Sequence, residues 1–167
     1  WFAEGLVDGL RVDHPDGLSD PAGYLTRLRD LVGPRAWIVI EKILAVGEPL
    51  DPSLPIDGTT GYEVLREIGG LFVDPAGADS LTTLVTSAGF RYPEAQESLR
   101  QLKIATATDI LSGDLARLCR TIEHATGVGH PRLPDAIAAL LAAVGVYRSD
   151  YPVLAQVLGA AMATTIA

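Results

Sequence analysis

The stretch Trp37–Glu41 has the sequence WIVIE, four apolar residues in succession followed by a carboxylate. Such a short run of β-branched and aromatic residues is typical of a strand buried on both faces of a parallel sheet. The stretch Gly9–Asp13, with the sequence GLRVD, is a second short run that ends in a carboxylate. Between them, Ser19-Asp20-Pro21 supplies a helix cap and a first helical residue, and Gly33-Pro34 supplies a helix end. The sequence therefore predicts a strand, a helix and a strand, which together form one βαβ unit.

The sequence pattern changes beyond this unit, from alternating strands and helices to helices alone. Residues 48–55 form a proline-rich connector, and residues 57–61 predict a turn and a helix cap. From residue 60 to residue 142, apolar side chains recur at helical spacing and strand patterns are lacking. We expect about five successive helices there, which is a helical insertion and not continued βα alternation.

The last part of the chain predicts a return to the sheet. Residues 145–149 have the pattern of one more short strand, and residues 151–167 that of one more helix. We therefore expect an α/β fold in three parts. Residues 1–50 hold the first two strands, residues 51–142 form the helical insertion, and residues 143–167 return to a strand and a helix.

The composition is that of one ordinary domain, since 167 residues with 48% hydrophobic side chains can bury a sizeable core. The net charge is −8 and the isoelectric point is near 4.7. A protein with this negative charge is repelled by nucleic acid and by anionic membranes. No apolar run reaches the ~20 residues that a membrane span needs. The single cysteine, Cys119, allows no internal disulfide and is expected to be a buried, inert thiol. These features favour a cytoplasmic protein with no nucleic-acid or membrane partner.

Two carboxylates, Asp13 and Glu41, directly follow the first two predicted strands. In a β/α barrel this end of a strand faces the active site. If the strands are parallel neighbours roughly 5 Å apart, the carboxylates have the separation of about 5 to 5.5 Å used by retaining glycosidases. Arg11 lies on the same side of its strand as Asp13 and would keep that carboxylate ionised, as a nucleophile requires. Strand-end carboxylates also bind metals or cap helices, so the pattern alone leaves those roles open.

Longer motifs surround both carboxylates. GLRVDHPDGL at residues 9–18 and WIVIEKIL at residues 37–44 resemble the α-amylase superfamily segments that hold the catalytic nucleophile and the acid/base glutamate. GTTGY at residues 58–62, GLFVDP at residues 70–75 and VYR at residues 146–148 resemble one branch, the maltooligosyltrehalose synthase family.

The resemblance implies a partial (β/α)8 barrel, about strands four to six, with the helical insertion after strand five. The chain starts at Trp1 without an initiator methionine and stops at Ala167 without a helix cap, so we expect a piece of a longer polypeptide. The third catalytic carboxylate of the family would lie beyond the chain. The resemblance therefore also implies that the isolated chain is inactive.

The activity implied by the resemblance is intramolecular transglucosylation. The reducing-end α-1,4 bond of a maltodextrin becomes an α,α-1,1 bond, as in trehalose, by a retaining double displacement without a metal or an organic cofactor. Asp13 would be the nucleophile, Glu41 the acid/base, and four side chains would contact the maltooligosaccharide: Arg11, His14, Lys42 and Tyr62. His14 could equally satisfy its own turn, and alternation along the strand points Lys42 away from Glu41.

Two other functions stay open at this stage. One is another α-amylase relative that acts on α-1,4-glucans, although the motif at residues 58–62 argues against it. The other is a non-catalytic helical interaction domain whose strands serve only as core. The sequence leaves the oligomeric state open.

Overall fold

A computed structural model describes residues 1–90 and 95–166. The chain divides into two compact units, which are described separately. The first unit joins Trp1–Val73 to Val146–Ala155, and the second joins Asp74–Gly145 to the residues from Gln156 onward.

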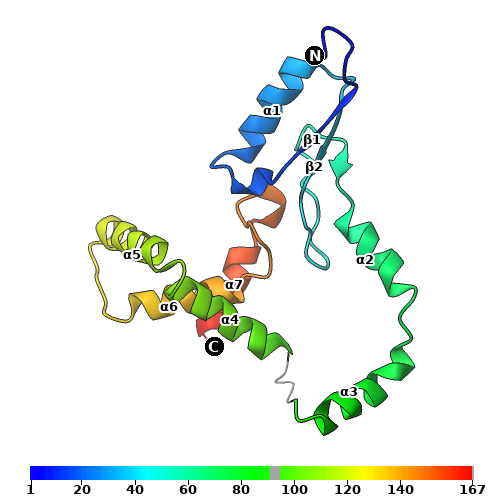
Figure 1. Cartoon of the computed structure of the whole chain (residues 1–167). Coiled ribbons are helices and arrows are strands. Elements are labelled where there is room, and N and C mark those ends of the chain that lie inside the picture. Colours follow the sequence, from blue (N-terminus) through cyan, green and yellow to red (C-terminus); the bar gives the residue numbers. More distant parts are fainter. Residues whose placement is uncertain (91–94, 167) are drawn as a thin grey trace. The chain divides into compact units, whose positions relative to one another are not determined.

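A three-stranded parallel sheet forms the centre of the first unit (Figure 1). The strands β1 (Gly9–Val12), β2 (Trp37–Ile40) and β3 (Gly58–Thr59) lie in the order β1-β2-β3. β1 and β2 pair with Gly9 opposite Trp37 and Val12 opposite Ile40. Ile38 and Ile40 are completely buried, as expected for a strand covered on both faces. The two predicted strands and their parallel pairing are therefore confirmed.

The predicted crossover helix is α1 (Pro21–Val32). The Asp20 carboxylate accepts a hydrogen bond from the Gly23 amide at 2.8 Å, and Pro21 occupies the first helical turn. Gly33, at a φ of 88°, ends the helix. Leu25 is completely buried, which shows that the helix packs one apolar face against the rest of its unit.

The prediction for residues 57–61 was wrong in part, because Gly58–Thr59 is a strand and not only a turn and cap. The Asp57 amide donates to Ile38 O at 2.8 Å, and the Thr60 amide donates to Ile40 O at 2.9 Å. A strand of two residues that includes a glycine has no alternation to recognise, so tertiary pairing alone defines it. The helical segment consequently follows the third strand and not the second.

The strand predicted at residues 145–149 is also absent, since the structure assigns these residues to irregular backbone. Arg148 explains their conformation, because its guanidinium donates to Asp16 O at 3.0 Å, to Leu18 O at 2.5 Å and to Ser19 O at 3.2 Å. Side-chain hydrogen bonds to a distant turn therefore hold this segment in place of a backbone ladder.

The remaining elements are short helices. Five α-helices occupy the described part of the predicted helical region: α2 (Tyr62–Gly70), α3 (Ala78–Ser87), α4 (Ala95–Thr108), α5 (Ser112–Thr126) and α6 (Leu133–Ala143). Three 3-10 turns and one further helix complete the fold: η1 (Pro15–Gly17), η2 (Pro75–Gly77), η3 (Pro152–Leu154) and α7 (Val157–Ile166). None of the described helices is long and apolar enough to cross a membrane.

The second unit has its core between α5 and α6. Leu115, Cys119 and Ile137 are buried there, and Ile122 and Leu133 pack against them. The prediction that Cys119 is buried is confirmed. The helix predicted over residues 151–167 begins only at Val157, after the turn η3, and its last predicted residue lies outside the described residues.

The compact units do not follow the expected boundaries after residues 50 and 142. Residues 51–73, expected in the helical insertion, lie in the first unit because β3 pairs with β2. Asp51 also ties this connector to η3, since its carboxylate accepts hydrogen bonds from Ser53 N at 2.8 Å, Ser53 Oγ at 2.6 Å and Val153 N at 3.2 Å.

Asp51→Asn is expected to destabilise the first unit by about 1–3 kcal/mol, because an amide cannot accept all three hydrogen bonds at a buried site. The hydrogen bonds from Ser53 hold the pKa of Asp51 below its usual value. The stabilisation is therefore fully present above the unfolded pKa of about 3.9 and is lost as the pH falls through the lower folded pKa. The free energy of unfolding is measured by urea denaturation followed by tryptophan fluorescence. This signal reports on the first unit, because both tryptophans, Trp1 and Trp37, lie in it.

The matched control is Asp30→Asn, which changes an exposed residue of α1 and should leave the urea midpoint unchanged. The difference between the wild type and Asp51→Asn should be constant from pH 7 to 5 and shrink below pH 4. A difference that grows as the pH falls contradicts this assignment.

Candidate active site

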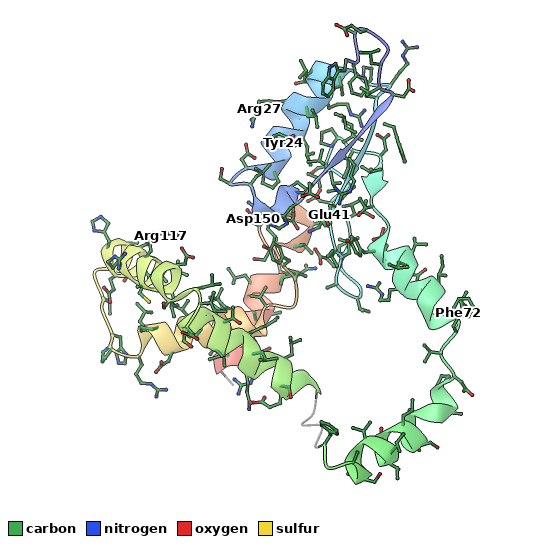
Figure 2. All side chains as sticks on the ribbon, viewed as in Figure 1. Tyr24, Arg27, Glu41, Phe72, Arg117 and Asp150 are labelled. Carbon is green, nitrogen blue, oxygen red and sulfur yellow. The ribbon has the colours of Figure 1, made fainter. Side chains whose placement is uncertain are left out.

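The two sequence-predicted catalytic carboxylates lie side by side at one end of the sheet. Val12 is opposite Ile40 in the ladder, and the Glu41 amide donates to Val12 O at 2.8 Å. Asp13 and Glu41 therefore leave neighbouring strands, whose backbones are about 4.8 Å apart in a sheet. Glu41 and Asp150, both labelled in Figure 2, lie at this same end of the sheet.

Arg11 joins the two carboxylates. Its guanidinium contacts Asp13 Oδ1 at 2.7 Å and Glu41 Oε1 at 3.4 Å. The hydrogen bond from Arg11 is the main reason why the pKa of Asp13 lies below its usual value. The Asp13 side chain is 74% exposed and the Glu41 side chain only 23%. Asp13 is thus an accessible, ionised carboxylate, and Glu41 is the more enclosed partner.

Arg11→Met is expected to raise the pKa of Asp13 towards that of a free aspartate, because the strongest donor to the ionised form is lost. Titration of the Asp13 carboxyl carbon by NMR measures this change directly and needs no enzymatic activity. Arg27→Met, which removes an exposed guanidinium 3.8 Å from Asp20, serves as the control and should leave the Asp13 titration unchanged. An unchanged titration in Arg11→Met would disprove the role of Arg11.

His14 and Tyr62 approach Glu41 from two other elements. The His14 amide donates to Glu41 Oε2 at 3.3 Å, and the Tyr62 hydroxyl donates to Glu41 Oε1 at 3.5 Å. His14 is the one non-glycine residue of the described chain with a positive φ, at 39°. A left-handed backbone at such a residue is strained, and strain of this kind clusters at functional sites.

A cavity of about 400 Å³ opens beside Glu41, within the size range of small-ligand sites. Its lining residues are His14, Asp16, Glu41, Lys42, Ile43 and Tyr147. The His14 ring packs edge-on against Tyr147, with 5.7 Å between the ring centroids. The sequence reasoning missed Tyr147, although the motif at residues 146–148 could have indicated it, because that motif was assigned to a strand.

Lys42 differs from the other predicted substrate contacts. It is only 2% exposed, and its amine lies 2.8 Å from Asp16 Oδ2 and 3.2 Å from Glu48 Oε1. The amine is therefore engaged in ion pairs, although Lys42 and Asp16 also line the cavity beside Glu41. The geometry brings together Asp13, Glu41, Arg11, His14 and Tyr62, whereas the amine of Lys42 is engaged with the buried carboxylates of Asp16 and Glu48. Whether any of these residues binds substrate stays a prediction.

The two carboxylates joined by one arginine at the ends of neighbouring parallel strands have the arrangement that is typical of the retaining class of glycoside-acting enzymes. Curated proteins of two Mycobacterium tuberculosis strains, both called "Putative maltooligosyl trehalose synthase", are 60% identical to this chain over 165 residues. The matched region is 99% of this chain and 22% of each relative. No protein-family model matches the chain.

Solved structures give the same result. The maltooligosyltrehalose synthase of Arthrobacter ramosus matches 99% of this chain with a TM-score of 0.88 and 42% identity, and the match covers 21% of that protein. A Sulfolobus tokodaii protein described as a hypothetical maltooligosyl trehalose synthase matches 96% of this chain with a TM-score of 0.71 and 30% identity, over 22% of its own length. The resemblance to the maltooligosyltrehalose synthases is therefore confirmed over almost the whole chain, which spans about 22% of the length of these curated relatives.

Proposed function

We propose that this chain is the catalytic-carboxylate segment of an intramolecular transglucosylase that forms α,α-1,1 bonds at the reducing ends of maltooligosaccharides. The observation that carries the proposal is the contact of one guanidinium, that of Arg11, with both Asp13 and Glu41 at the ends of neighbouring strands. The names of the relatives support the substrate class and the product.

In the first step, the Asp13 carboxylate attacks the anomeric carbon next to the terminal glucose. The bond between this carbon and the glycosidic oxygen breaks, and the Glu41 carboxyl group donates its proton to that oxygen. The products are a covalent glycosyl ester on Asp13, the ionised Glu41 and a free terminal glucose. Arg11 keeps Asp13 ionised for the attack, in agreement with the lowered pKa of that carboxyl.

In the second step, the released glucose turns over and presents its anomeric hydroxyl. Glu41 takes the proton from this hydroxyl, the oxygen attacks the anomeric carbon of the ester, and Asp13 leaves as a carboxylate. Substrate and product are isomers, so neither water nor a cofactor is consumed. Water has to be kept out during the turnover because it would otherwise hydrolyse the ester. The cavity beside Glu41, walled by His14 and Tyr147, is a place where the glucose could be retained.

The segment is proposed to work only within a longer polypeptide. Three strands cannot enclose a sugar on all sides, and the curated relatives are more than four times as long as the matched region. We therefore expect the 167-residue chain to be inactive by itself. We also propose that the protein is cytoplasmic. Its single cysteine cannot form an internal disulfide bond, so the chain gains no stability from an oxidising compartment.

The test compares the 167-residue chain with the longest polypeptide that contains it, each incubated with maltopentaose. Reducing ends and free glucose are both followed over time. Loss of reducing ends without an equal release of glucose supports the proposal for the polypeptide in which it occurs. New reducing ends would instead assign a hydrolase acting on α-1,4-glucans. If the longer polypeptide neither consumes nor binds maltopentaose, the segment is a non-catalytic helical interaction domain.

A further inference from the structure

A buried charge cluster lies close in sequence to the two carboxylates. The Lys42 amine forms ion pairs with Asp16 Oδ2 at 2.8 Å and Glu48 Oε1 at 3.2 Å. The side chains of the three residues are 2%, 6% and 1% exposed. Burying three charged groups is costly unless their geometry is well defined, so the cluster is expected to fix the segments that carry it.

Tyr151 completes the cluster from a distant part of the sequence. Its hydroxyl donates to Asp16 Oδ1 at 2.7 Å, and the Lys42 amine lies 5.0 Å from the centre of its ring. Tyr151 is 4% exposed, and burial raises the pKa of its hydroxyl, so it stays protonated and continues to donate. Asp16 therefore has a hydrogen-bond donor on each carboxylate oxygen and cannot rotate without losing one.

The ion pair between Lys42 and Asp16 connects the two segments that carry the proposed catalytic carboxylates. Lys42 directly follows Glu41, and Asp16 is three residues beyond Asp13. Their ion pair therefore joins the end of β2 to the turn η1 that follows β1. His14, whose amide donates to Glu41, is the residue directly before this turn. Arg11 joins the two carboxylates on the exposed side, and Lys42 joins the same two segments on the buried side.

We propose that Lys42 is a positioning residue for the transglucosylation. It holds η1 against the end of β2 through Asp16, and so keeps the His14 amide on Glu41 and fixes Glu41 relative to Asp13. This role rests on the proposed function and differs from a substrate contact, because the buried Lys42 amine is already engaged in ion pairs with Asp16 and Glu48.

The variants are chosen so that loss of position can be separated from loss of folding. Lys42→Met leaves two buried carboxylates without a cation and is expected to be unstable. The triple variant Lys42→Met, Asp16→Asn and Glu48→Gln removes all three charges while keeping similar shapes. Lys42→Arg keeps the cation. Lys103→Met is the matched control, because Lys103 is the other lysine of the chain and bonds Val144 O within the second unit.

The first experiment measures kcat and KM for maltopentaose in the longest polypeptide that contains the chain. The triple variant should lose about 10²-fold in kcat, the cost of a misplacement of roughly 1 Å, while KM changes less than about threefold. Lys42→Arg should recover at least about a tenth of the wild-type kcat, and Lys103→Met should match the wild type. A triple variant with wild-type kcat, or with its loss confined to KM, would overturn the positioning role.

The second experiment is independent of activity and measures hydrogen exchange of the hydrogen-bonded amides of His14, Gly17 and Leu18. The triple variant should exchange these amides at least about tenfold faster than the wild type, and Lys103→Met should not. Unchanged protection overturns the inference even if the wild type is active. A wild type that does not consume reducing ends refutes the proposed function, and the exchange rates then decide the role of Lys42 in holding the turn.

Discussion

Asp13→Asn in the longest polypeptide that contains this chain is expected to slow the loss of reducing ends from maltopentaose by about 10³-fold or more. Asparagine has almost the same shape as aspartate and can still accept the hydrogen bond that Arg11 donates to Asp13. The fold of the site should therefore be kept, while the amide oxygen is too weak a nucleophile to form the glycosyl ester. The initial rate of reducing-end loss measures the effect.

Asp8→Asn is the control, since Asp8 is exposed just before the opposite end of β1 and should be replaceable without loss of rate. A second test labels the nucleophile chemically. It uses a fluorinated glycosyl fluoride, which forms the glycosyl ester but is released from it slowly. The peptide that contains Asp13 should gain the mass of the sugar in the wild type and not in Asp13→Asn. Labelling at another residue, or a rate loss below tenfold, would show that Asp13 is not the nucleophile.

The sequence was sufficient to predict those parts of the fold that local chemistry determines. WIVIE at residues 37–41 has an unambiguous buried-strand pattern, and Asp20, Pro21 and Gly33 give clear helix boundaries. Two carboxylates that follow such strands must meet at one end of the sheet once the strands pair in parallel, so the approach of Asp13 to Glu41 could be anticipated, whereas the contact of Arg11 with Glu41 was not predicted.

Features that depend on distant partners could not be predicted in this way. The strand at Gly58–Thr59 exists only because β2 offers it an edge, and the segment after residue 145 is shaped by the hydrogen bonds of Arg148 to a turn 129 to 132 residues away in sequence. The burial of Lys42 with Asp16 and Tyr151 has the same origin. No local periodicity shows that three polar residues from separate segments will satisfy one another.

Glu41→Gln is expected to lower the rate on maltopentaose by about 10² to 10⁴-fold, the usual contribution of a general acid. The loss should depend on the leaving group, because fluoride departs without a proton whereas a sugar oxygen does not. With α-maltosyl fluoride, ester formation in Glu41→Gln should therefore be slowed by less than about tenfold. A burst of fluoride followed by a slow phase should be seen, since the variant also lacks the base for the second step.

Azide distinguishes this catalytic role of Glu41 from a structural one. Azide attacks without losing a proton, so its addition to Glu41→Gln with α-maltosyl fluoride should abolish the slow phase and yield an α-glycosyl azide, the retained configuration. Glu67→Gln, at an exposed position of α2, should behave as the wild type with both substrates. If Glu41→Gln were equally slow with maltopentaose and the fluoride, the Glu41 contacts with Arg11, His14 and Tyr62 would be holding the site together rather than serving proton transfer. Rescue by azide with retention requires that Asp13 still forms the ester, so the same product also tests the assignment of the nucleophile.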